Sequence, residues 1–272
     1  MKLLLSLLVL SLTTTAFATK KAQTEEESSI RFVPVKSTPE ADHIELHITF
    51  PANNAMKSGS PVDVQIHVEG FPMRIESEFP RKDELENSGE GQSVRIVVDN
   101  NGYFQVNEAL IDTIDDDEDY YDSVLDVKVP FDLEPGLHVM RAFPVRSYGE
   151  SLKGDGCFAA VQFYYDSRQN NQHFDLRKPY LTYNEPQGTY QYREDKPILL
   201  DFYISNCELS SDGYKVRVTI DGTNRKVITD WHPYYVYGLD KGSHTVRLEL
   251  LDSQNKSVPG PLNDVKQTIQ IN

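Results

Sequence analysis

Residues 136–141 read Gly136-Leu137-His138-Val139-Met140-Arg141, and residues 242–247 repeat the pattern as Gly242-Ser243-His244-Thr245-Val246-Arg247. The match continues outside this stretch. Val94-Arg95-Ile96-Val97-Val98-Asp99 corresponds to Val216-Arg217-Val218-Thr219-Ile220-Asp221, and Pro61-Val62-Asp63-Val64 corresponds to Pro197-Ile198-Leu199-Leu200. Segments that recur in the same order predict one structural unit used twice.

Each unit has the pattern of a β-structure. From His43 to Phe50 apolar and polar residues alternate, and a period of two predicts a half-buried strand. Further strands are predicted over 62–68, 94–98, 103–106, 124–131, 137–145 and 158–165, and in the second unit over 181–187, 197–205, 214–220, 225–228, 233–237, 243–251 and 264–271. Short strands separated by turns, without a helical period, predict an all-β chain of two tandem antiparallel sandwiches.

The repeated histidines lie in longer segments that resemble a known corner. Residues 133–142 and 239–248 are similar to the E–F corner of fibronectin type III and related bacterial immunoglobulin-like domains. A tyrosine in that corner normally bonds nearby backbone through its hydroxyl. His138 and His244 occupy its place here, and an imidazole N–H can make a similar bond. The resemblance implies two immunoglobulin-like sandwiches.

The N-terminal residues have the features of a secretory signal. A basic start is followed by an apolar run over 3–12 and by Ala16-Phe17-Ala18, which predicts a signal peptide over 1–18 that is cleaved on export. The apolar run is too short to span a bilayer, and no later segment is longer. We therefore expect an exported protein, periplasmic or extracellular, that does not span a membrane.

Composition shifts predict the remaining boundaries. Residues 19–40 are polar and aperiodic, which favours a flexible leader. The first sandwich is expected over 41–166, with an acidic loop inserted between strands. Residues 167–179 are turn-rich and predict a linker, and the second sandwich is expected over 180–272.

The net charge of -15 excludes one class of partner, because such a field repels nucleic acid. The two cysteines, Cys157 and Cys207, fall at different points of the two units. If the units stack end to end, the sulfurs lie beyond disulfide reach, so we expect free or intermolecularly paired thiols.

The densest charge cluster is the acidic run over 112–122. Carboxylate oxygens suit calcium, and Asp115, Asp117 and Asp119 are the candidate ligands for a weak site. The spacing of an EF-hand is absent, however, and dense like charges usually keep a loop solvated. No other metal or cofactor is implied.

Catalytic motifs are poor. Gly149-Glu150-Ser151-Leu152-Lys153 ends in lysine where a nucleophile elbow needs glycine, and Ser253-Gln254-Asn255-Lys256 falls in a predicted turn. We therefore expect a protein that is not an enzyme. A hydrolase with a carboxylate site on its loops stays open as an alternative.

Aromatic residues are concentrated in the second unit. Trp231, Tyr234, Tyr235 and Tyr237 are the binding candidates, since aromatic rings stack on sugars and on partner proteins. The favoured function is an exported, non-catalytic interaction or structural protein that binds a protein or another cell-envelope component. The alternatives are a pair of carbohydrate-binding modules that recognise a glycan, the hydrolase, and an assembly factor with an exposed edge strand.

Overall fold

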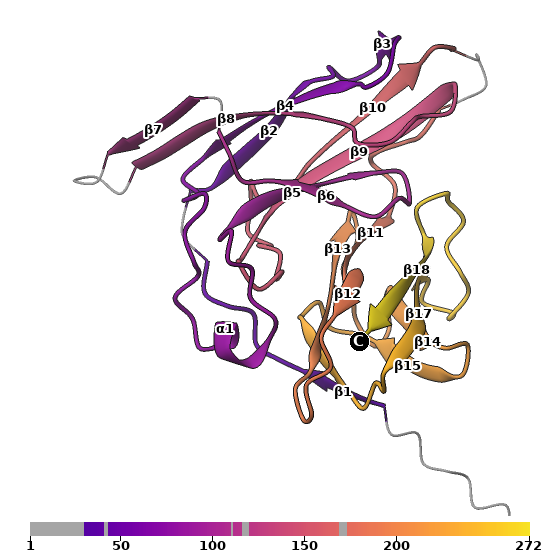
Figure 1. The fold of residues 1–272 in the computed structure, drawn as a ribbon. Coiled ribbons are helices and arrows are strands. Elements are labelled where there is room, and N and C mark those ends of the chain that lie inside the picture. The colour runs from indigo at the N-terminus through magenta and orange to yellow at the C-terminus, as the bar shows by residue number, and fades with distance from the viewer. Residues whose placement is uncertain (1–29, 41–42, 110, 116–119, 169–172) are drawn as a thin grey trace, which may run out of the picture.

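The computed structural model describes residues 30–40, 43–109, 111–115, 120–168 and 173–272, with the backbone alone for residues 111–115 and 120. Four sheets form two immunoglobulin-like β-sandwiches that pack face to face (Figure 1). The predicted fold class is confirmed. The predicted signal peptide lies outside the described residues. In the part that is described, no helix is long and apolar enough to cross a membrane.

The first sandwich has the immunoglobulin strand order. One sheet runs β2-β4-β8-β7, which is A-B-E-D in immunoglobulin terms, and the other runs β3-β10-β9-β5-β6, in which G, F, C and C′ are adjacent. The bounds are β2 Glu45–Phe50, β3 Ala55–Lys57, β4 Asp63–Glu69, β5 Ser93–Val98, β6 Phe104–Val106, β7 Ile111–Asp115, β8 Tyr120–Lys128, β9 Gly136–Val145 and β10 Ala159–Tyr165. One short helix, α1 (Arg81–Glu84), interrupts the connection between β4 and β5.

The second sandwich repeats this order. Its sheets run β1-β16-β13-β11 and β12-β18-β17-β14-β15. The bounds are β1 Arg31–Pro34, β11 Tyr180–Glu185, β12 Gly188–Tyr190, β13 Ile198–Ser205, β14 Lys215–Ile220, β15 Asn224–Ile228, β16 Tyr234–Tyr237, β17 Gly242–Leu251 and β18 Asp264–Ile271. The repeated segments therefore occupy equivalent strands, β5 with β14 and β9 with β17.

Strand β1 corrects the prediction of a flexible leader. Residues 31–34 pair antiparallel with β16 of the second sandwich, from Arg31 opposite Tyr237 to Pro34 opposite Tyr234. This is the place that β7 takes in the first sandwich. Phe32 packs against the second core, so burial of an aromatic ring holds the strand there. A segment that precedes the first sandwich thus completes a sheet of the second.

The repeated corner is built as expected. The ring of His138 donates from Nε2 to the carbonyl of Glu134 at 2.7 Å and from Nδ1 to Asp99 at 2.7 Å. The second corner makes the same bonds from His244 to Asp240 and Asp221. Burial opposes protonation of both histidines, but the bonds to carboxylate and carbonyl outweigh it and raise the pKa of each ring. Both histidines therefore belong to the framework.

Candidate functional site

The two sandwiches meet face to face, not end to end. The outer face of β5-β9-β10 packs against the outer face of β11-β13-β16. Val97, Phe143 and Val145 of the first sandwich form one apolar cluster with Tyr203 of the second. The rings of Phe143 and Tyr203 lie 5.0 Å apart between centroids. This packing explains why β5 and β11 are buried on both faces.

A buried ion pair crosses the junction beside this cluster. Arg95 of β5 lies 2.7 Å from the carboxylate of Glu185 in β11, and each side chain is 7% exposed. Arg95 also donates to the side-chain carbonyl of Asn184 at 2.6 Å. The phenols of Tyr103 and Tyr190 donate to Glu185 at 3.2 and 2.7 Å. Burial, together with the charge of Glu185, raises the pKa of both phenols, so they stay protonated donors.

A second polar network lies deeper in the junction. Asp201 of β13 is fully buried and accepts bonds from Ser151, Lys153 and Asn184. The Lys153 ammonium lies 2.5 Å from Asp201 and donates to the Ser151 hydroxyl at 2.9 Å. The network therefore fixes the two sandwiches to each other.

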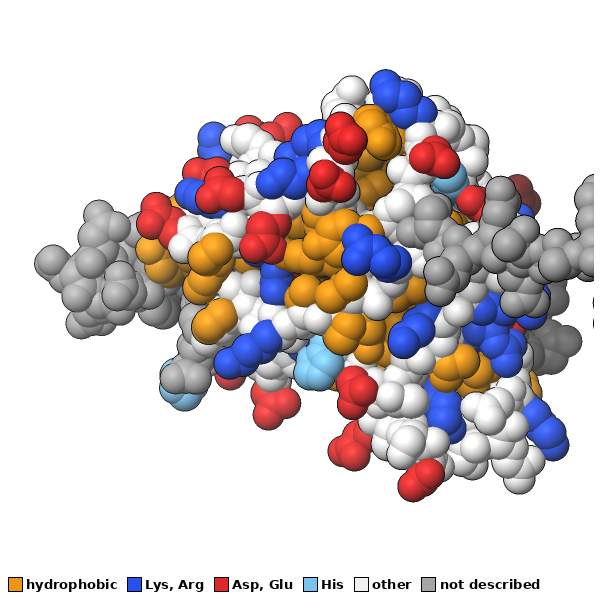
Figure 2. Space-filling view, turned by 90° about the horizontal axis from the view of Figure 1, so that it is seen from below, with side chains coloured by type: hydrophobic (Ala, Val, Ile, Leu, Met, Phe, Trp, Pro, Cys, Tyr) orange, Lys and Arg blue, Asp and Glu red, His pale blue; other side chains and the backbone are white. Residues whose placement is uncertain are grey.

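Residues 35–40 form a strap from β1 to the first sandwich. The backbone N–H of Thr38 donates to Glu150 at 2.8 Å, and the carboxylate of Glu150 also pairs with Arg81. Arg81 reaches the carbonyl of Lys36 at 2.6 Å and the phenol of Tyr235 at 3.1 Å. The strap thus ties α1, β1 and β16 together on the face shown in Figure 2, where apolar side chains gather between Lys and Arg side chains.

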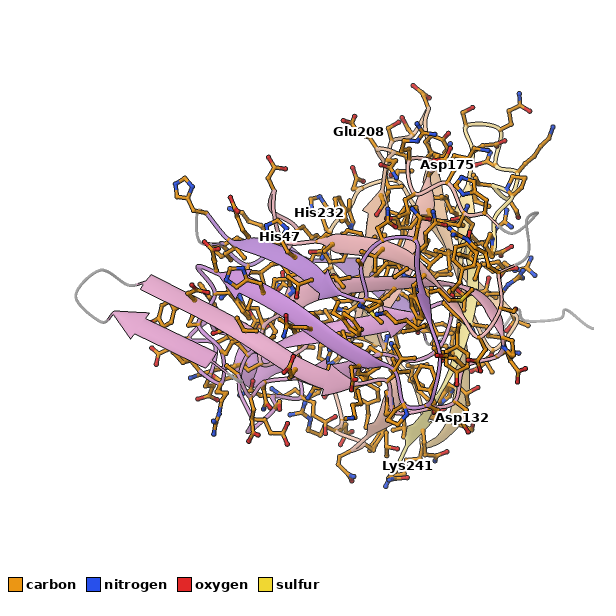
Figure 3. The ribbon with its side chains drawn as sticks, turned by 90° about the horizontal axis from the view of Figure 1, so that it is seen from above. His47, Asp132, Asp175, Glu208, His232 and Lys241 are labelled. Atoms are coloured by element: carbon orange, nitrogen blue, oxygen red, sulfur yellow. The ribbon has the colours of Figure 1, made fainter. Side chains whose placement is uncertain are left out.

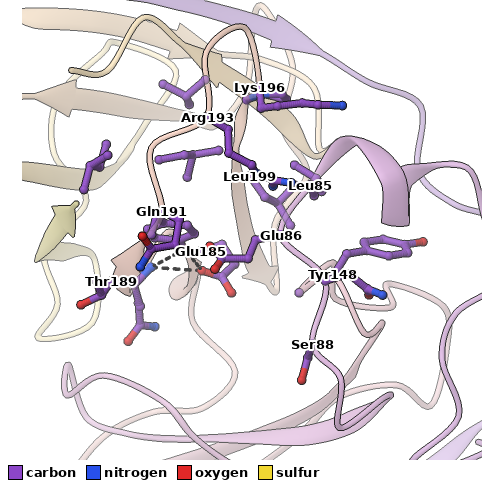
Figure 4. A pocket seen from close by; sticks show the side chains of 18 of the residues that line it. Leu85, Glu86, Ser88, Tyr148, Glu185, Thr189, Gln191, Arg193, Lys196 and Leu199 are labelled. Atoms are coloured by element: carbon purple, nitrogen blue, oxygen red, sulfur yellow. Dashed lines mark hydrogen bonds between the residues drawn. The ribbon is translucent and has the colours of Figure 1, made fainter. Parts of the chain in front are cut away.

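A cleft of about 310 Å³ opens beside these networks, between the two sandwiches. Leu85, Glu86 and Ser88 line it from the first sandwich (Figure 4). Thr189, Gln191, Tyr192, Arg193 and Lys196 line it from the second. The Arg95–Glu185 pair and the phenols of Tyr103 and Tyr190 form part of its lining. The volume is at the lower end of the range for ligand sites, about 300–1,000 Å³.

Each wall of the cleft includes an edge strand. Gln105 of β6 and Thr189 of β12 both line it, and each of these strands has a neighbour on one side only in the described sheets. Asn272 donates to the carbonyl of Tyr190 at 3.0 Å and accepts from the N–H of Tyr192 at 2.9 Å, so both face β18. Because backbone directions alternate along a strand, the N–H and C=O of Thr189 and Gln191 point away from β18.

The predicted aromatic platform is not an exposed surface. Tyr234 and Tyr235 are 4% and 5% exposed, Tyr234 in the second core and Tyr235 against α1. Trp231 is half-buried and donates from its indole to the carbonyl of Phe202 at 2.8 Å. Tyr237 is half-buried beside Arg31 of β1. These rings therefore pack in the second core, at the junction and along β1.

The candidate calcium ligands cannot be placed. Asp117 and Asp119 lie outside the described residues, and Asp115 ends β7, where the backbone alone is described. Among the described residues no group of three or more His, Cys, Asp or Glu side chains is arranged to hold a metal ion. The calcium site therefore stays a prediction.

The serine of the Gly149–Lys153 motif and the two cysteines lie outside the lining of the cleft. Ser151 is 2% exposed and does not line it. Both cysteines are free, and burial raises the pKa of Cys157 to about 12 and that of Cys207 to about 11. A thiol with so high a pKa is a poor nucleophile near neutral pH.

Searches of known protein families and of curated proteins give no match. Solved structures with a similar fold include the fibronectin(III)-like modules of Clostridium thermocellum CbhA, at 12% identity over 83% of this chain and 93% of that chain, with a TM-score of 0.28. CBD12 from CALX1.2 matches at 8% identity over 83% and 99%, with a TM-score of 0.20. Domains 4 and 5 of the S-layer protein SbsC match at 9% identity over 86% and 99%, with a TM-score of 0.18. Similarities this low carry no functional argument.

The cleft residues were not among the sequence candidates, although one signal pointed to them. Arg95 and Glu185 of the cleft are charged residues within predicted strands, as are Arg141 and Asp201 beside it at the junction. A charge in such a strand indicates that both faces of the sheet are covered and that the charge has a partner. Sequence alone does not identify that partner, since the residues meet only when the sandwiches dock.

Proposed function

We propose that this chain is an exported, non-catalytic interaction protein that binds an extended segment of a partner protein in the cleft between its sandwiches. The observation that carries the proposal is the free edge of β12 at the cleft. Thr189 and Gln191 direct backbone N–H and C=O groups away from β18, and Thr189 is exposed. An extended peptide can add to such an edge as a further strand.

The side chains around this edge suit a peptide of alternating character. Leu85, Tyr148 and Leu199 supply an apolar wall, while Arg193 and Lys196 supply positive charge. Lys196 also donates to the carbonyl of Asp83 at 3.1 Å, which brings the second sandwich to α1 at this side of the cleft. The favoured segment is therefore extended, with apolar residues alternating with acidic ones.

The non-catalytic part of the proposal rests on the hydrogen bonds that Glu185 and the Ser151–Lys153–Asp201 network make within the protein. Both oxygens of Glu185 already accept bonds, one from Arg95 and the other from Tyr190 and the backbone of Gln187. The Ser151–Lys153–Asp201 network is buried outside the cleft. These groups are held by the protein and are not directed at a substrate. A hydrolase would need an acid or base that is free to exchange a proton.

Carbohydrate binding remains a second candidate, and one observation favours it. Tyr192 lines the cleft with 42% of its surface exposed, and the amides of Gln105, Gln187 and Gln191 lie around the same space. An exposed ring with amide neighbours can stack on a sugar and bond its hydroxyls. In this alternative the platform is Tyr192 and not Trp231.

Selection from a displayed random-peptide library on the mature chain tests the proposal. Binding of selected peptides is then compared between Tyr192→Ala and Val227→Ala. Val227 is the matched control, because it is 43% exposed on β15, the opposite edge of the same sheet. We expect Tyr192→Ala to weaken binding about tenfold and Val227→Ala to leave it unchanged.

Other outcomes contradict the proposal. Peptides that respond to Val227→Ala and not to Tyr192→Ala would place the binding surface elsewhere. Binding to a glycan array that Tyr192→Ala abolishes, with no peptide selected, would favour the carbohydrate alternative. Turnover of chromogenic ester or glycoside substrates by the mature chain would contradict the non-catalytic role.

A further inference from the structure

The junction leaves one sheet of each sandwich uncovered. It covers the β5-β9-β10 sheet of the first sandwich and the β11-β13-β16 sheet of the second. The remaining outer faces belong to β2-β4-β8 of the first sandwich and β14-β17-β18 of the second. Both faces lie on the sheet of each sandwich that does not form the junction.

The outer face of the second sandwich is basic, although the chain carries a net charge of -15. Its cations surround a concavity of about 460 Å³, and we call this surface the basic face: Arg217, Arg225, Arg247 and Lys266. Glu249 and Asp264 pair with Arg217 and Arg247. No ion pair among the described residues includes Arg225 or Lys266, so the face keeps an excess of positive charge.

The outer face of the first sandwich is acidic. Along β2 and β4 every second side chain turns away from the core, as the alternating burial of both strands shows. Figure 3 looks onto this surface, from which His47 projects. We call it the acidic face, and its carboxylates are Glu45, Asp63, Glu69, Asp122 and Asp126. Among the described residues of β2, β4 and β8, Lys128 is the single lysine, and it pairs with Asp63 at 3.0 Å.

Two of the three arginines of the basic face are the counterparts of arginines at the junction. Arg217 takes the place in β14 that Arg95 takes in β5, and Arg247 takes the place in β17 that Arg141 takes in β9. At the junction Arg95 reaches Glu185, and Arg141 donates to the carbonyl of Leu181 at 3.4 Å. Both contacts are with β11, the first strand of the next sandwich. Its counterpart in the first sandwich is β2, which carries Glu45 of the acidic face.

We propose that the basic face of one chain docks on the acidic face of a second copy, so that copies associate head to tail through the same pairing of sheets that joins the two sandwiches. Opposite charge and the repeated position of the arginines both favour this partner.

The expected association is weak and sensitive to salt. The junction within the chain buries apolar and aromatic side chains, whereas the basic face and the acidic face are charged. Exposed charge pairs are screened by ions. Because the two faces differ, each added copy leaves one of each free, and association does not stop at a dimer.

Sedimentation velocity of the mature chain at low ionic strength tests the proposal. We expect the weight-average sedimentation coefficient to rise between about 10 µM and about 1 mM, in the range of a polar, non-obligate interface. Arg225→Glu/Lys266→Glu removes the basic face, and Glu45→Lys/Glu69→Lys removes the acidic face. Each double variant should remain monomeric alone, and their equimolar mixture should form dimers and nothing larger.

The matched control is Lys178→Glu/Lys241→Glu, which changes charge equally on two exposed lysines outside the basic face and should associate like the wild type. Monomeric wild-type protein throughout this range, or a mixture of the two variants that stays monomeric, would overturn the proposal. Binding of dextran sulfate to the basic face without self-association would also overturn it, because that face would then serve a polyanion.

Discussion

Arg95 of the first sandwich and Glu185 of the second form an ion pair of 2.7 Å in which both side chains are almost completely buried. The pair lies at the point where the two sandwiches and the cleft meet. Removing one partner leaves the other charge buried and uncompensated, which costs about 3–5 kcal/mol. We expect Arg95→Met to lower the free energy of unfolding by this amount in urea, with Trp231 fluorescence as the probe.

The control is the double variant Arg95→Met/Glu185→Met, which removes both charges. It should recover a large part of the loss, since a buried pair replaced by apolar residues is often neutral. If the double variant lost as much free energy of unfolding as the two single variants together, the two charges would not be coupled.

The His138 corner predicts a pH-dependent contribution to stability. The pKa of His138 is raised in the folded protein above its unfolded value of about 6.5. The bonds of the protonated ring therefore stabilise the folded protein fully below about pH 6.5. This contribution is lost as the pH rises through the folded pKa. We expect His138→Gln to cost about 1–3 kcal/mol at low pH and less at high pH. Urea unfolding across this range measures the difference. His232→Gln, at an exposed histidine outside both corners, is the control variant.

Strand β1 predicts that residues before the first sandwich stabilise the second. Phe32 packs against the second core from a half-buried position, so Phe32→Ala should cost about 2 kcal/mol, below the range for a fully buried ring. Val33 is 36% exposed and faces the other side, and Val33→Ala should cost much less. Equal effects of the two variants in thermal unfolding would contradict the assigned register.

Substitution of Trp231 is expected to lower the free energy of unfolding and to leave peptide binding intact. Its indole bonds the carbonyl of Phe202, and its ring packs on Tyr203 at 5.6 Å between centroids. Trp231→Ala should lower stability by about 3 kcal/mol, since it removes both a packed ring and a buried bond. Folded Trp231→Ala should bind selected peptides as the wild type does. Complete loss of peptide binding in the folded variant would show that Trp231 is part of the binding site.

The strand pattern could be predicted because it is local. Alternation along 43–50 and the repeated corners at His138 and His244 were enough to predict two sandwiches. Strand β1 could not be predicted, because four residues that end in Pro34 show no local strand pattern and pair with β16 far along the chain. The sequence also could not show that both faces of β16 are covered, with Tyr234 in the second core and Tyr235 at the junction.

The cleft could not be predicted from the sequence for the same reason. It joins Leu85 from an insertion of the first unit to Thr189 after the first strand of the second. The connection between β4 and β5, which includes α1, supplies Leu85, Glu86 and Ser88 to the cleft.

The affinity of a selected peptide for Thr189→Pro tests the central claim most directly. The substitution removes the N–H that points away from β18 and leaves the bonds between Asn272 and β12 in place. If a partner segment adds to β12, a folded Thr189→Pro protein should bind the peptide at least about tenfold more weakly, while Val227→Pro on the opposite edge should bind as the wild type does. Unchanged affinity in folded Thr189→Pro would contradict the account.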